Sequence, residues 1–106
     1  MPKKRFSLES MVHVNLFKTT GSFAENKDLA RKIRLDKINP AIANGQGIVL
    51  DFENIDSVTQ AFIHVLISDL IRIYGSEVLE KISFKNCNET VQKIINIVVD
   101  YMQESE

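Results

Sequence analysis

Cysteine, glycine and proline are scarce in this 106-residue sequence, which has one cysteine, four glycines and two prolines. A single thiol, Cys87, excludes an intramolecular disulfide and a cysteine-rich zinc site, and it favours a reducing, cytoplasmic setting. The glycines are scattered, so neither a Walker motif nor a dinucleotide-binding motif is present. We therefore expect no bound cofactor and no metal.

Long apolar runs and an excess of one charge are also missing. The longest apolar runs, residues 61–67 and 94–99, are much shorter than the roughly 18 residues of a membrane span. No apolar stretch of a secretory signal follows the basic residues 3–5. A net charge of -1 disfavours a protein that grips nucleic acid over a broad surface. We expect a protein that binds neither membrane nor nucleic acid.

The composition suffices for one folded unit. Hydrophobic residues make up 44% of the chain and charged residues 25%, which is enough apolar material for a core in a chain of one domain's length. We predict a single domain over residues 11–106, preceded by a flexible segment over residues 1–10.

The first part of the chain predicts a strand and then a helix. Residues 11–17 alternate apolar and polar side chains, which is typical of a strand with one buried face. Ser22 and Glu25 have the spacing of a capping box, which predicts a helix from near Phe23. Its inward face comprises Leu29, Ala30, Ile33 and Ile38, and its solvent face comprises Lys27, Asp28, Arg31, Lys32 and Arg34.

The middle of the chain predicts a helix break and a buried strand. Pro40 lacks a backbone donor, so it should kink the first helix or start a new turn at Asn39. Residues 44–45, Asn and Gly, should end that helix. Residues 47–52 are apolar and β-branched without alternation, which predicts a strand covered on both faces at the centre of the sheet.

The last part predicts two further helices and a strand. Residues 59–74 form a periodic helix ended by Gly75, with a wide apolar face and a narrow polar stripe of Gln60, His64, Ser68 and Arg72. Residues 81–85 alternate as a strand. Asn88 is placed to cap a last helix with an inward stripe of Val91, Ile94, Ile95, Val98 and Met102.

Alternation of strands and helices predicts an α/β fold, with a mostly parallel or mixed four-stranded sheet packed with three to four helices. The first strand lies at an edge and is either parallel or antiparallel to its neighbour. In such folds, binding sites form where strand ends meet helix starts. This rule indicates residues 17–22 and 52–60.

No arrangement of side chains points firmly to catalysis. Cys87 with His13 or His64 could form a nucleophile and base, but a small, partly buried cysteine is the favoured interpretation. Asp51 and Glu53 would share one face if the strand continued, either as an acid/base pair or, as we favour, as ordinary hydrogen-bond acceptors. We therefore expect that the protein is not an enzyme.

The segment from residue 48 to residue 67 resembles the STAS superfamily, the domain type of anti-sigma-factor antagonists. Those domains have an apolar strand that ends in Asp, followed by a motif that opens a helix and faces the partner. The stricter STAS-like family of uncharacterised domains is more similar, in Leu50-Asp51-Phe52 followed by residues 58–62, Val-Thr-Gln-Ala-Phe, and in the turn at residues 86–88. The resemblance covers residues 11–102.

The resemblance implies a cytoplasmic, bacterial-type regulatory module that binds another protein, with a GHKL-type ATPase or kinase as the partner. The aligned phosphoacceptor position holds Ala61, which leaves Ser57 and Thr59 as candidate phosphoacceptors. Both are also placed to cap the long helix. The predicted partner-binding residues are Thr20, Ser22, Asp56, Ser57, Thr59, Gln60, Ala61 and His64.

Two other hypotheses stay open. A strand-end pocket with Asp51, Thr59 and His64 could bind a small ligand or nucleotide at the start of a helix. Alternatively, Ile97, Val99 and Tyr101 lie outside the inward stripe of the last helix, which favours a homodimer.

Overall fold

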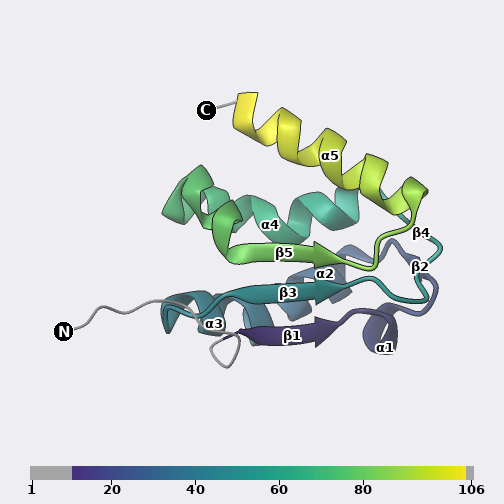
Figure 1. Cartoon of the computed structure of the whole chain (residues 1–106), viewed down its shortest axis with the longest axis horizontal. Helices are drawn as coiled ribbons and strands as arrows, with labels where there is room; N and C mark the ends of the chain where they lie inside the picture. The colour runs from purple at the N-terminus through teal and green to yellow at the C-terminus, as the bar shows by residue number, and fades with distance from the viewer. Residues whose placement is uncertain (1–10, 105–106) are drawn as a thin grey trace.

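The structure, a computed structural model that describes residues 11–104, is built on parallel strands. The main sheet has the order β1 (Val12–Asn15), β3 (Ile48–Asp51) and β5 (Ile82–Lys85) (Figure 1). A separate parallel pair joins β2 (Phe23–Ala24) to β4 (Ser57–Val58). The α/β class is confirmed, but a three-stranded sheet and a two-stranded pair replace the four-stranded sheet. The first strand is parallel to its neighbour. The predicted flexible segment lies outside the described residues.

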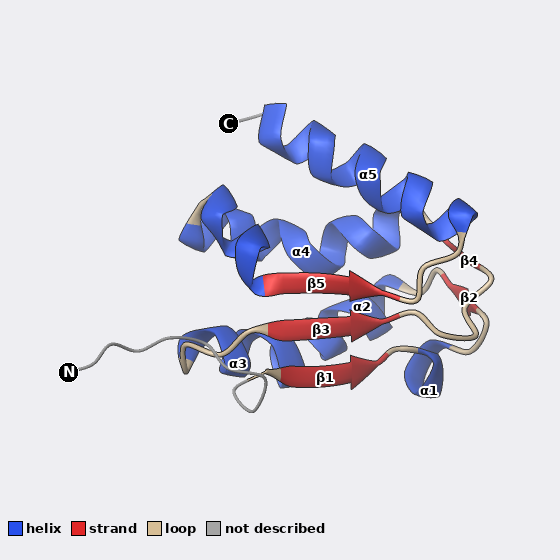
Figure 2. Ribbon diagram, in the orientation of Figure 1, coloured by secondary structure: helices blue, strands red, loops and turns tan. Residues whose placement is uncertain are grey.

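The helices of the two crossover connections lie on one face of the main sheet (Figure 2). The chain adds its strands in one direction, so right-handed crossovers place each connecting helix on the same side. Within residues 11–104 there are five α-helices, more than the three to four predicted. The helical segments are α1 (Phe17–Thr20), α2 (Lys27–Ile33), the π-helical turn η2 (Arg34–Ile38), α3 (Asn39–Ala43), α4 (Gln60–Tyr74), the 3-10 turn η3 (Ser76–Lys81) and α5 (Glu89–Glu104).

The core lies between the sheet and these helices. Val14, Leu50 and Phe84 align across the three strands and point to the helices, so the next row, Asn15, Asp51 and Lys85, points the other way. All three apolar residues of β3 are buried, which confirms the predicted central strand. From α4, the core receives Phe62, Ile63, Leu66, Ile67, Leu70 and Ile71.

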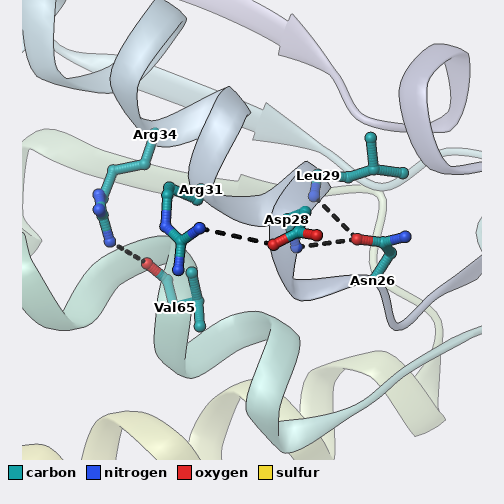
Figure 3. Close-up of polar contacts among 6 residues, drawn as sticks. All are labelled: Asn26, Asp28, Leu29, Arg31, Arg34 and Val65. Carbon is teal, nitrogen blue, oxygen red and sulfur yellow. Dashed lines mark hydrogen bonds and ion pairs between the residues drawn. The ribbon is translucent and has the colours of Figure 1, made fainter.

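The predicted helix start near Phe23 is wrong. Phe23 and Ala24 are extended because they pair with β4, and α2 begins only at Lys27. Its cap is Asn26, not Ser22: the Asn26 side chain accepts hydrogen bonds from the backbone N–H groups of Asp28 at 2.8 Å and Leu29 at 3.1 Å (Figure 3). These bonds satisfy two of the free donors at the helix start.

A π-helical turn carries α2 into α3. The backbone N–H of Asn39 donates to the carbonyl of Arg34, five residues earlier. This wider turn keeps Ile33 and Ile38 in the core although they are five positions apart. Pro40 cannot donate to the preceding turn, and α3 begins at Asn39, as predicted.

The predicted place of Arg34 on the solvent face is also wrong. Its side chain is only 11% exposed and reaches the middle of α4. There Nη1 donates to the carbonyl of Val65 at 2.8 Å (Figure 3), and Nη2 lies 3.1 Å from an oxygen of Asp69. Asp69 also pairs with Arg72. Arg34 thus joins α2 and η2 to α4.

Gly75 ends α4, as predicted, with a backbone that other residues avoid. Its φ of 83° and ψ of 168° fall in a region that is essentially restricted to glycine. No heavy atom lies within 4 Å of an added Cβ, so the cost of a side chain comes from the backbone alone. We expect Gly75→Ala to lower the free energy of unfolding by about 1 to 2 kcal/mol in urea denaturation. A change below about 0.3 kcal/mol would show that the backbone relaxes without cost.

Candidate functional site

The two stretches that the strand-end rule indicated are joined by backbone hydrogen bonds. The carbonyl of Ser22 accepts from the N–H groups of Asp56 at 2.7 Å and Ser57 at 3.4 Å, and the N–H of Thr59 donates to the carbonyl of Ala24 at 3.1 Å. Together with the pairing of β2 and β4, these bonds hold residues 22–24 beside residues 56–59. The loops form one surface at the carboxyl edge of the sheet.

Asn88 connects a third segment to this surface. Its side-chain amide donates to the carbonyls of Ile55 at 3.3 Å and Asp56 at 3.0 Å. Its side-chain oxygen accepts from the N–H of Val91 at 2.8 Å, which confirms Asn88 as the predicted cap of α5. One side chain therefore both starts α5 and supports the loop before β4. The sequence indicated only the first role.

The predicted partner-binding residues differ in how far the fold uses their side chains. Thr59 caps α4, since its hydroxyl accepts from the N–H of Phe62 at 3.1 Å. The Thr20 hydroxyl, half-buried, donates to the carbonyl of Leu16 at 3.2 Å or of Gly21 at 2.9 Å. Ser57 is half-buried in β4. The exposed members of the set are Ser22, Asp56, Gln60, Ala61 and His64.

Asp51 does not form a carboxylate pair with Glu53. Strand β3 ends at Asp51, and Asn54 then adopts a positive φ of 71°, so Glu53 lies in a turn. One oxygen of Asp51 instead accepts from the side chain of Asn86 and from the N–H of Glu53, both at 2.9 Å. These hydrogen bonds, with that from Asn86 contributing most, lower the pKa of Asp51.

The remaining candidates for chemistry lie on different elements. His13 lies on β1 and His64 on α4. Burial, and secondarily the charge of Asp51, raise the pKa of the Cys87 thiol, which lowers the fraction of reactive thiolate. Among the described residues, no three side chains of the metal-binding types gather into one group. The two cavities that His64 lines include neither Asp51 nor Thr59, so the pocket of the ligand hypothesis is not assembled there.

Asp51 predicts a pH dependence of stability. Because its pKa is lowered in the folded state, its contribution is fully present above the unfolded-state pKa of about 3.9 and is lost as the pH falls through the lower folded value. We expect Asn86→Gly, which removes the side-chain donor but tolerates the positive φ at this position, to raise the pKa of Asp51 in an NMR titration. The stability lost in this variant should be larger at neutral pH than below the folded pKa. An equal loss at both pH values would contradict the assignment.

A groove between α4 and α5 is the feature that sequence reasoning missed. One cavity of about 500 Å³ is lined on α4 by Gln60, Ala61, His64 and Val65 and on α5 by Ile97, Val98 and Tyr101, with Lys27 of α2. A second cavity, of about 540 Å³, shares His64 and Tyr101 and continues to Arg72 and Gly75. The predicted polar stripe of α4 and the off-stripe residues of α5 were the available signals. The sequence does not show that they face each other.

The fold and this surface define a small α/β domain with polar loops at the carboxyl edge of a parallel sheet. The family model described as "STAS-like domain of unknown function" (DUF4325) matches residues 30–92, more than half of the chain. The chain belongs to this STAS-like family, as its sequence resemblance indicated. Searches of curated proteins and of solved structures found no significant match. None of the described helices is long and apolar enough to cross a membrane.

Proposed function

We propose that this chain is a non-catalytic regulatory module that works by binding another protein through the carboxyl-edge loops and the start of α4. The observation that carries the proposal is the hydrogen-bonded junction between residues 22–24 and 56–59. The backbone of this junction holds the loops in place, while the side chains of Ser22, Asp56 and Gln60 stay exposed. A surface with a fixed backbone and exposed side chains loses little entropy when a partner binds.

Membership of the STAS-like family supports a regulatory role, and the resemblance to anti-sigma-factor antagonists favours a GHKL-type ATPase as the partner. Ala61 occupies the aligned phosphoacceptor position and has no hydroxyl. Ser57 and Thr59 are the neighbouring hydroxyls, both half-buried. A phosphate on Thr59 would lie at the start of α4, where the helix dipole and free N–H groups favour negative charge.

Affinity capture from cells of origin, with the wild-type chain and single variants as bait, tests the proposal. Gln60→Arg and Ala61→Arg place a long charged side chain on the proposed surface. Ala43→Arg is the matched control, because Ala43 is also an exposed helical alanine but lies on α3, away from the carboxyl-edge loops (Figure 1). We expect the first two variants to lose a partner that Ala43→Arg retains, with all three folded by circular dichroism.

Retention of every partner by Gln60→Arg and Ala61→Arg would contradict the proposed surface. Core residues are unsuitable for this test. Phe62 and Ile63 are fully buried, so their truncation would cost about 2 to 5 kcal/mol and would remove binding by unfolding the domain.

A further inference from the structure

The groove between α4 and α5 has the size of a helix. It extends along α4 from Gln60 to Gly75, which at 1.5 Å per residue is about 22 Å, or roughly four helical turns. Two packed helices present ridges and a central furrow in which a third helix can lie. The furrow here is formed by elements that contact each other directly, so its shape exists before any partner arrives.

The walls of the groove are apolar and unusually exposed. Ile97 is 49% exposed and Tyr101 64%, and both face Ala61 and Val65 across the furrow. The polar residues His64 and Ser68 of α4 also line the groove. An apolar side chain that enters the furrow would remove Ile97 and Tyr101 from water, which is favourable at about 25 cal/mol per Å² of buried apolar area.

The charged side chains that line the groove are basic. Lys27 lies at one end and Arg72 at the other, and none of the described residues that line either cavity is acidic. Asp69, the acidic residue of α4, lines neither cavity and pairs with Arg34 and Arg72. Lys27 is the first residue of α2, where the helix dipole disfavours a cation. Helix stability therefore does not explain this lysine.

We propose that this groove docks an acidic amphipathic helix of a partner protein, about four turns long. The inference rests on the proposed function, since Gln60, Ala61 and His64 belong to both surfaces, and it adds the chemistry of the partner. The apolar face of the helix contacts Ile97 and Tyr101, and its carboxylates approach Lys27 and Arg72. A second copy of this chain fits less well, because an isologous dimer would place one basic groove against another.

Two stapled helical peptides of about 16 residues provide the test, with identical leucine faces and either glutamate or lysine on the other face. Binding is measured at low salt by fluorescence anisotropy, and the bound site is mapped by NMR. We expect the glutamate peptide to bind at least about tenfold more tightly than the lysine peptide and to shift the amides of Ala61, Val65 and Ile97.

Charge reversal on the protein gives the matched pair of variants. Lys27→Glu should weaken the binding of the glutamate peptide at least about fivefold. Lys37 is an exposed lysine that lines neither cavity of the groove, so Lys37→Glu should leave the affinity within about twofold of the wild type. Lys27→Glu puts a carboxylate at the start of α2, which the dipole favours, so loss of folding cannot explain its effect. Equal binding of both peptides, amide shifts outside the groove, or no effect of Lys27→Glu would overturn the proposal.

Failure of this inference is distinguishable from failure of the proposed function. Asp56→Arg changes the loops but not the groove, whereas Ile97→Asp changes the groove but not the loops. A captured partner that is lost with Asp56→Arg but retained with Ile97→Asp and Lys27→Glu supports the loop surface and overturns the groove. A concentration-dependent dimer in sedimentation that Ile97→Asp dissociates also overturns the proposal and assigns the groove to a second copy.

Discussion

Arg34→Ala is expected to lower the free energy of unfolding by about 3 kcal/mol, because it removes one partner of a largely buried ion pair together with the packing of the arginine stem. The guanidinium donates to the carbonyl of Val65 and contacts Asp69. Asp69 keeps Arg72 as a partner, which limits the cost of the charge left behind. Urea denaturation of the wild type and the variant measures the difference.

Two further substitutions separate the causes. Arg34→Met keeps most of the stem, so it should cost about half as much as Arg34→Ala, and the difference between them reports packing. Arg31→Ala is the control: this arginine contacts Asp28 at 3.5 Å, and both side chains are more than half exposed. Its removal should change stability by no more than about 0.5 kcal/mol. If Arg34→Ala has an effect no larger than Arg31→Ala, the contact of Arg34 with α4 does not stabilise the fold.

Arg34 also shows where sequence reasoning reaches its limit. Arg34 follows the buried Ala30 by four residues, and its N–H donates to the carbonyl of Ala30, so regular helical geometry already places it beside the buried face. Its charge, not its position, led to its assignment to the solvent face. The π-helical turn of η2 starts at this residue and changes the phase only of the residues that follow. The spacing of five between Ile33 and Ile38 was a signal, since regular α-helical periodicity expects an apolar residue one position earlier. The strongly patterned elements were easier to predict from the sequence. The buried strand β3 and the wide apolar face of α4 follow from local patterns that tertiary packing preserves.

The candidate surface was predictable in place but not in construction. Parallel strands bring their carboxyl ends to one edge, so the rule for binding sites in α/β folds selected residues 17–22 and 52–60. The spacing of Ser22 and Glu25 predicted a helix start that does not form. The residues between them instead pair with β4 as a short strand. Prediction of the groove would require the rotation of α4 relative to α5. That rotation depends on contacts between residues far apart in the chain, which periodicity within one helix does not encode.

Asn88→Ala is expected to lower the free energy of unfolding by about 2 to 3 kcal/mol, because it removes the cap of α5 and two side-chain hydrogen bonds to the loop before β4. Asn88→Asp separates these roles, since its carboxylate can still accept from the N–H of Val91 but cannot donate to the carbonyls of Ile55 and Asp56.

Hydrogen exchange of single amides measures the two roles of Asn88 independently. Asn88→Asp should leave the protection of the Val91 amide close to the wild type while the amides of Asp56 and Ser57, which bond to Ser22, exchange faster. Asn88→Ala should accelerate all three. Equal protection of Asp56 and Ser57 in both variants and the wild type would mean that the backbone alone holds the loop. Faster exchange there, together with weaker partner capture by Asn88→Asp, would show that the side-chain amide of Asn88 maintains the proposed binding surface. Asn88 would then support this surface as well as cap α5.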